Sequence, residues 1–345
     1  MVMNSKALNE IRRRFTVDNT NLTCIRGCYV SEKREIISMF KLPPVSLPPE
    51  EGDRYLSLFK KALSGTPDKN LVEIPFANEA VGVSDEHKLL TALRDTAITD
   101  DDMAEVFFQR VLAGLPQEGS FLILLAHDAY DVPFRNHNGE RNNEMSDEVF
   151  KYIICAVCPV KLSKASLSYC AADNLFHPSE PDWVVGAPEL GFMFPCFEER
   201  AANIYSALCY TRDPAQSHEG FVHAVFGSEP PMPAEEQKEI FQEILQDTLA
   251  EECSLEVVQT MHEQMRDRIA EQKAEKNAEP LRVSVPEVRQ ALAACGVPEE
   301  KADAFEEQYT QRFGAGMDVS AANVVDVKQF EVRTPNVVIK VDPAH

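Results

Sequence analysis

The segment His127–Pro133, which reads HDAYDVP, carries the densest set of side chains that are suited to chemistry. It follows an apolar run that predicts a strand over Ser120–His127, so its polar groups are expected where that strand ends. Imidazole and carboxylate groups in such a position suit divalent-metal ligation or general-base catalysis. We therefore take His127, Asp128 and Asp131 as the candidate catalytic and metal-ligating residues. In the structural alternative, the aspartates cap a turn and the histidine is a satisfied structural residue.

A second motif pairs two cysteines three residues apart, Cys155 and Cys158. Residues at that spacing in a strand over Tyr152–Val160 point to opposite faces, so the two thiols are not expected to hold one ion. The other cysteines lack standard zinc spacing. We expect core thiols instead. The total of nine cysteines is odd, which favours a reducing compartment and hence a cytoplasmic protein.

The region Asp182–Pro195 is rich in aromatic and turn residues and contains the only tryptophan, Trp183. Such a composition is typical of a pocket wall, and also of a strand connection packed on a core, which we favour. The signatures GxSxG, GxGxxG and HExxH and the phosphate-binding Walker loop are missing. The sequence therefore excludes the commoner hydrolase, nucleotide-binding and zinc-protease motifs, and no cofactor is predicted.

Charge narrows the choice of partners. The 345 residues include 56 acidic and 34 basic side chains, a formal net charge of −22. Residues 233–310 alone hold 19 acidic and 8 basic residues. Such a surface repels nucleic acid and anionic membranes, so neither is expected as a partner. The longest apolar stretch, Phe121–Ala126, is too short to cross a bilayer, and the N-terminal residues lack the apolar core of a secretory signal.

Periodicity and chain breakers predict the elements before residue 230. Four helices are expected, with Ser84 as the cap of the third: Asn4–Phe15, Glu50–Leu63, Asp85–Arg94 and Asp100–Ala113. Runs of β-branched and aromatic residues predict seven strands: Cys24–Val30, Glu35–Met39, Ser120–His127, Tyr152–Val160, Ser166–Ala171, Leu190–Phe194 and Ile204–Tyr210. We expect a short helix near Ser146–Tyr152, and a hairpin that joins Tyr152–Val160 to Ser166–Ala171.

The last third reads as helical. Amphipathic stripes predict helices from Pro233, over Leu255–Lys273, after Ser284 and over Pro298–Phe313. The last two helices flank a glycine turn, but the acidic residues of the second one argue against contact with DNA phosphates. Two alternating runs, Lys328–Arg333 and Asn336–Val341, predict terminal strands.

These elements predict an α+β fold in three regions. A mainly helical N-terminal region spans 1–115, a central β-rich module spans 116–228, and an acidic helical region that ends in two strands spans 229–345. The central module is expected to hold a mainly antiparallel sheet flanked by the N-terminal helices. The two terminal strands are expected to form a β-hairpin.

Several strings of the sequence resemble a bacterial family, domain of unknown function 4317. They are Arg13-Arg14-Phe15-Thr16 with Asp18-Asn19, Gly27-Cys28-Tyr29-Val30, the HDAYDVP segment, Ser146-Asp147-Glu148-Val149 and Asp182-Trp183-Val184-Val185-Gly186. The resemblance covers about Arg12 to Pro343 and implies a bacterial cytoplasmic protein, without an activity, cofactor or catalytic residue to carry over. Similar chains continue past the final β run, so the resemblance also implies a shortened chain or a shorter variant.

Three hypotheses follow. The leading one is a non-enzymatic scaffold or regulator that binds a protein partner with a basic or amphipathic surface. The alternative is a metal-dependent hydrolase of a phosphoester or related small substrate, which would use His127, Asp128 and Asp131 with a divalent metal. The third is a mimic of nucleic acid whose carboxylates occupy a basic groove.

Overall fold

A computed structural model describes residues 3, 5–135, 141–249, 263, 266–268, 271, 281–294, 296–314, 318–324, 330–334 and 337–341. Its centre is an eight-stranded sheet in which every neighbouring pair is antiparallel. The strands are β1 (Ile25–Val30), β2 (Ile36–Leu42), β3 (Leu71–Pro75), β4 (Ser120–Arg135), β5 (Arg141–Leu162), β8 (Trp183–Val185), β9 (Leu190–Phe194) and β12 (Ser206–Thr211). They follow the order β2-β1-β4-β5-β9-β12-β3, and β8 pairs with the end of β5. The mixed fold with a central antiparallel sheet is thus confirmed.

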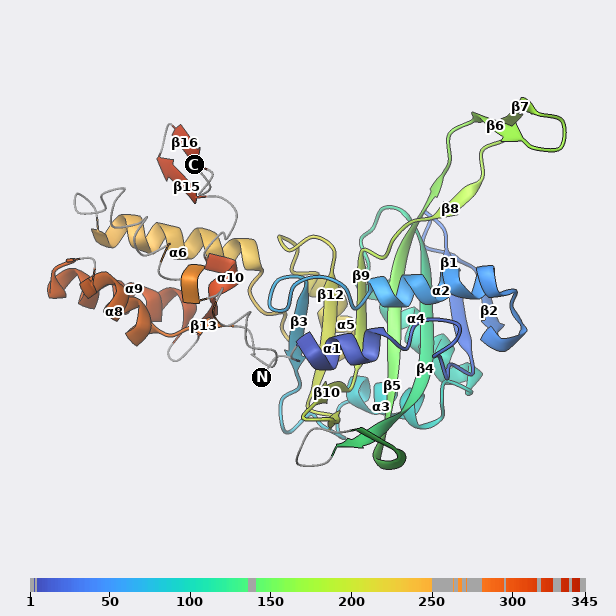
Figure 1. Cartoon of the computed structure of the whole chain (residues 1–345), viewed down its shortest axis with the longest axis horizontal. Coiled ribbons are helices and arrows are strands. Elements are labelled where there is room, and N and C mark those ends of the chain that lie inside the picture. Colours follow the sequence, from blue (N-terminus) through green and yellow to red (C-terminus); the bar gives the residue numbers. More distant parts are fainter. Residues whose placement is uncertain are drawn as a thin grey trace.

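Helices cover both faces of this sheet (Figure 1). Their bounds are α1 (Ser5–Arg12), α2 (Pro49–Lys61), α3 (Asp85–Asp95), α4 (Asp101–Gly114) and α5 (Glu219–Phe226), with a short 3-10 turn η1 (Pro44–Ser46) before α2. One core lies between the sheet and α3, α4 and α5, and the other lies between the sheet and α1 and α2. Along β4, Ile123 and Leu125 belong to the first core, whereas Leu122 and Leu124 belong to the second.

The sequence of β5 does not alternate between polar and apolar residues, and the structure explains why. Side chains on both of its faces are buried, so the run from Ile153 to Cys158 is apolar without interruption. Cys155 lies in the α3–α4–α5 core and Cys158 in the α1–α2 core, which confirms the prediction that the two thiols face opposite sides.

Local capping fixes where two helices begin. The side chain of Ser84 accepts a hydrogen bond from the His87 backbone N–H at 3.2 Å, which confirms the predicted cap of α3. At α4, the carboxylate of Asp100 accepts from the Met103 N–H at 3.0 Å, and the acidic residues of the first turn favour the positive end of the helix dipole.

A C-terminal helical unit has its own core, in which Phe241, Leu292 and Phe305 are buried. It comprises α6 (Ala234–Leu249), β13 (Arg282–Val283), α8 (Val285–Ala294), α9 (Glu299–Phe313), β14 (Val319–Ser320) and α10 (Ala321–Val324), with β13 paired to β14. Further along the chain, β15 (Phe330–Thr334) pairs with β16 (Val337–Val341). The helix predicted over Leu255–Lys273 lies almost entirely outside the described residues.

The helical unit contacts the sheet unit at the turn before β3. Asn323 donates to the Asp68 carbonyl at 2.9 Å, Arg282 pairs with the Asp68 carboxylate at 3.3 Å, and Lys69 pairs with Glu235 at 3.3 Å. The sheet extends across residue 115, where a boundary was predicted: β1 pairs with β4 and β3 pairs with β12, while β2 joins the sheet through β1.

Two local predictions are wrong. The helix predicted near Ser146–Tyr152 is part of β5, because cross-strand pairing with β4 continues to Arg135 and Arg141 and overrides the local preference. The predicted hairpin partner of Ser166–Ala171 is also wrong. In the structure, β6 (Ser166–Cys170) pairs with β7 (Leu175–Ser179), while β5 pairs with β4, β8 and β9. A further small ribbon joins β10 (Cys196–Glu198) to β11 (Ala201–Asn203).

None of the described helices combines the length and the apolar character that crossing a bilayer requires.

Candidate functional site

The three candidate residues lie inside β4 and not beyond its end. His127 pairs with Ile153, Asp128 with Tyr152 and Asp131 with Val149. Because side chains alternate along a strand, His127 and Asp131 share one face of the sheet and Asp128 faces the other. Within the described part of the chain, these three are not among the groups whose ligand atoms come together. The structure therefore gives the predicted ligand set no common centre.

Asp128 is the anchor of a buried polar network. Arg14, which follows α1, donates through Nε at 2.6 Å and through Nη2 at 3.1 Å to the two carboxylate oxygens. The Tyr152 hydroxyl donates to the same carboxylate at 2.8 Å, and the guanidinium of Arg14 lies 4.7 Å from the centroid of the Tyr130 ring. Burial, and then the neighbouring carboxylate, raises the pKa of Tyr152 well above its ordinary value. Asp128 is 1% exposed, so this bidentate pair replaces the hydration that the carboxylate has lost.

A second ion pair continues from this network. The Tyr130 hydroxyl donates to Glu10 at 2.5 Å, and Arg200 donates to both oxygens of Glu10 at 3.2 Å. Arg200 also donates to the Pro133 carbonyl at 2.8 Å. Burial and the hydrogen bond to Glu10 raise the pKa of Tyr130 to about 12. The two pairs fasten α1 and the segment after it to β4 and to the turn between β10 and β11, which is a structural role.

His127 has a different environment on the opposite face. It is 6% exposed, and its Nε2 is buried without a hydrogen-bond partner among the described residues. Burial is the main cause that lowers its pKa below 6.5. The imidazole is therefore neutral at pH 7, and protonating it costs stability.

This leads to a pH prediction for His127. A base whose folded pKa lies below its unfolded value binds protons more readily when unfolded, so stability falls as pH drops below 6.5. One such group contributes at most about 1.4 kcal/mol per pH unit. In urea denaturation, the free energy of unfolding of His127→Leu is expected to fall less between pH 7.5 and pH 5.5 than that of the wild type. Val83→Ser, at an exposed side chain that carries no titratable group, serves as the control and should leave the slope unchanged. A slope for His127→Leu equal to that of the wild type would contradict the prediction.

The six buried thiols are poor nucleophiles. Cys24, Cys28, Cys155, Cys158, Cys196 and Cys209 are free and buried. Burial raises the pKa of Cys28 to about 11 and those of Cys158 and Cys209 to about 12. These side chains act as small core hydrophobes.

A pocket of about 290 Å³, most of whose lining residues are polar or charged, lies between β3 and the helical unit. Asp68 Oδ2 and Asn323 Oδ1 are buried there and accept no hydrogen bond from a described residue. Burial raises the pKa of Asp68. The free oxygens suit water or another hydrogen-bond donor at the junction of the two units.

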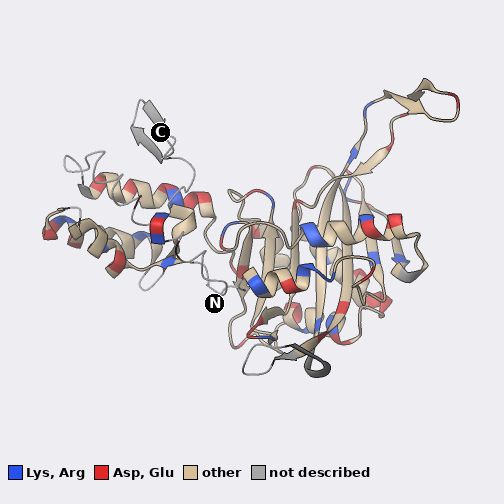
Figure 2. Ribbon diagram, viewed as in Figure 1, with Lys and Arg blue, Asp and Glu red and all other residues tan. Residues whose placement is uncertain are grey.

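The largest departure from an ordinary surface is a projecting segment that we call the arm, residues 161–185. Figure 1 shows β6 and β7 extending away from the body of the sheet, and Figure 2 shows few charges along them. At its base, Ser163 and Asp182 exchange two hydrogen bonds of 2.8 and 2.9 Å, and β8 pairs with the end of β5. The arm is thus a stem that carries a two-stranded hairpin at its end.

The arm exposes large apolar side chains. Leu167 is 68% exposed, Phe176 65% and Trp183 50%, and further examples are Leu162, Tyr169, Leu175, Val184 and Val185. In the hairpin, Leu167 pairs with Pro178 and Tyr169 with Phe176, so these four share one face. The rings of Tyr169 and Phe176 lie 5.4 Å apart. A contiguous apolar face of this kind marks an interaction surface.

Sequence reasoning missed this surface. The available signal was the pair of β runs on either side of Asp173 and Asn174, which is typical of a hairpin turn. Trp183, which the sequence placed in a pocket wall or in a connection packed on a core, is exposed instead. Local sequence cannot distinguish an apolar strand in a core from one that projects into solvent.

Comparisons with known proteins give one result. The family described as "Domain of unknown function (DUF4317)" matches residues 3–345. No curated protein and no solved structure matches the chain.

Proposed function

Because the chain belongs to the family described as Domain of unknown function (DUF4317), whose description states no activity, we propose a function from its surface: a non-enzymatic scaffold or regulator that binds another protein through the arm. The observation that carries this proposal is the apolar face of Leu167, Tyr169 and Phe176 on a hairpin held away from the core. A two-stranded hairpin is only marginally stable by itself in water, and docking would cover its apolar side chains.

The partner that fits is a protein with an amphipathic surface, in which an apolar strip is flanked by basic residues. The apolar strip matches the exposed face of the hairpin. The basic flanks match a net charge of −22, which steers positively charged partners toward the chain over long distances. The same charge opposes pairing between two copies of this chain, and it disfavours nucleic acid and anionic membranes as partners.

A cytoplasmic location is part of the proposal. Every cysteine that the structure describes is free, which suits a reducing compartment.

The hydrolase alternative gains no support from the arrangement of its residues. His127 and Asp128 point to opposite faces of the sheet, and the carboxylate of Asp128 is already held by Arg14 and Tyr152. Neither observation favours a bound divalent metal or a free general base. We therefore do not extend that hypothesis to a mechanism.

The test of the proposal compares the whole chain with an arm-deleted chain. Because Ser163 and Asp182 are hydrogen bonded at the base of the arm, residues 165–180 can be replaced by two glycines without moving β5 or β8. Affinity capture from a native bacterial lysate with the whole chain is expected to recover one protein at equal stoichiometry. The arm-deleted chain should recover none of it.

Two results would contradict the proposal. Equal recovery of the same protein by both chains would remove the arm from the interface. A whole chain that sediments as an arm-dependent dimer and captures nothing else would show that the apolar face serves self-association.

A further inference from the structure

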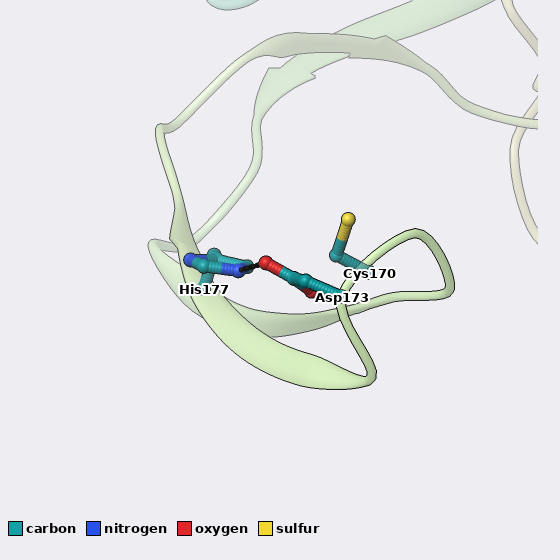
Figure 3. A group of neighbouring side chains, drawn as sticks. All are labelled: Cys170, Asp173 and His177. Atoms are coloured by element: carbon teal, nitrogen blue, oxygen red, sulfur yellow. Dashed lines mark hydrogen bonds and ion pairs between the residues drawn. The ribbon is translucent and has the colours of Figure 1, made fainter.

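We propose that the tip of the arm is a transition-metal site, formed by Cys170, Asp173 and His177 and suited to Zn²⁺. One ligand atom of each residue lies within 4.8 Å of the other two (Figure 3). It is the one such group of three in the described part of the chain. The inference concerns this chain alone and does not depend on the proposed partner.

The register of the hairpin explains why these side chains meet. Cys170 ends β6, and His177 lies in β7 opposite Ser168. Residues 168 and 170 share a face, so the thiol and the imidazole are diagonal neighbours on the same face of the ribbon. Asp173 lies in the turn between the strands, and its carboxylate reaches the His177 Nε2 at 2.5 Å. Three ligand types thus converge from one short hairpin.

The turn holds the carboxylate in place. Asp173 Oδ1 accepts a hydrogen bond from the Leu175 N–H at 3.1 Å, which leaves Oδ2 directed at the imidazole. Next to it, the Tyr169 hydroxyl donates to Asn174 at 2.6 Å and tightens the same turn. These bonds hold the Asp173 side chain in the turn, with Oδ2 next to the imidazole of His177.

The donor set selects the class of metal. Thiolate, imidazole and carboxylate together suit Zn²⁺ and related first-row ions, whereas Ca²⁺ prefers six to eight oxygen ligands. Zinc bond lengths of about 2.0 to 2.3 Å place tetrahedral ligand atoms roughly 3.3 to 3.8 Å apart. The three atoms reach that arrangement when the contact between Asp173 and His177 opens and Cys170 moves slightly inward. Three protein ligands leave a fourth position for water or for a partner's side chain.

The site lies on the face of the hairpin opposite to Leu167, Tyr169 and Phe176. Leu167, Tyr169 and Phe176 alternate with Ser168, Cys170 and His177, so the metal would not compete with a protein that covers the apolar face. By bridging β6, the turn and β7, the ion would instead stabilise a ribbon that has few tertiary contacts of its own. The metal therefore gives the exposed hairpin a fixed shape.

Cobalt titration tests the site directly. The whole chain, purified without a polyhistidine tag and kept reduced, is titrated with Co²⁺ while its absorption spectrum is recorded. We expect one Co²⁺ per chain, a thiolate-to-cobalt charge-transfer band, intense visible bands of four-coordinate cobalt, and displacement by Zn²⁺. Cys170→Ser should remove the charge-transfer band, and His177→Ala should weaken binding by more than about 100-fold.

Two controls keep the result specific. His223→Ala, at an exposed histidine outside the arm, should bind Co²⁺ as the wild type does. All variants should keep the wild-type circular dichroism, since the arm is remote from both sheet cores. A wild type without the charge-transfer band, or an unchanged band in Cys170→Ser, overturns the metal site. If the metal site is overturned but the chain still captures its partner, the proposed function is unaffected.

Discussion

Asp128→Ala is expected to lower the free energy of unfolding by about 3 kcal/mol, the largest single-residue effect on stability that we foresee. The change removes the acceptor of both Arg14 hydrogen bonds and of the Tyr152 hydroxyl. Arg14 then keeps a largely buried charge without its partner, and the fully buried Tyr152 loses its acceptor. Urea denaturation at pH 7, followed by circular dichroism, measures the difference.

Asp131→Ala is the matched control for this experiment. It removes the same chemical group three residues further along the same strand, but Asp131 is exposed. Its free energy of unfolding should stay within about 0.5 kcal/mol of the wild type. Replacing the whole ion pair, as in Arg14→Met with Asp128→Leu, should cost less than Asp128→Ala because no buried charge is left behind. Equal losses for Asp128→Ala and Asp131→Ala would contradict the structural role of Asp128.

The sequence predicted most of the scaffold, because its signals there are local. The cap at Ser84 and the strand over Leu190–Phe194 depend on residues close together in the chain, and both are confirmed. The separation of Cys155 and Cys158 followed from strand geometry alone. Where local propensity and tertiary packing agree, as in these elements, sequence alone is sufficient.

The candidate site was less predictable. The charged residues of HDAYD indicated a loop, whereas the structure continues the strand through them because Arg14, distant in sequence, neutralises Asp128 inside the protein. No local pattern reveals such a partner. The helix predicted near Ser146–Tyr152 is wrong for the same kind of reason, since pairing with a neighbouring strand outweighs the local preference. The exposure of the arm depends on the absence of covering elements, which sequence does not show.

The arm should carry most of the binding energy for a partner. Leu167 and Phe176 are exposed on one face of the hairpin, so the double variant Leu167→Ser, Phe176→Ser removes large apolar area from the interface without opening a core. A loss of at least about 2 kcal/mol is expected for two anchors of this kind, which corresponds to about 30-fold in the dissociation constant. Stability should change by less than about 0.5 kcal/mol, because neither side chain is buried.

Val83→Ser provides the matched control. Val83 is 65% exposed, like Phe176, but lies in the turn before α3 and away from the arm. A general loss of surface hydrophobicity would affect this variant as well, whereas a specific interface on the arm leaves it unchanged.

The dissociation constant of the captured partner, measured by calorimetry for the wild type, the arm double variant and Val83→Ser, tests the central claim most directly. We predict binding to the arm double variant at least about 30-fold weaker than to the wild type, with Val83→Ser equal to the wild type. Equal dissociation constants for all three chains would show that the exposed apolar face of the arm is not where this protein binds its partner.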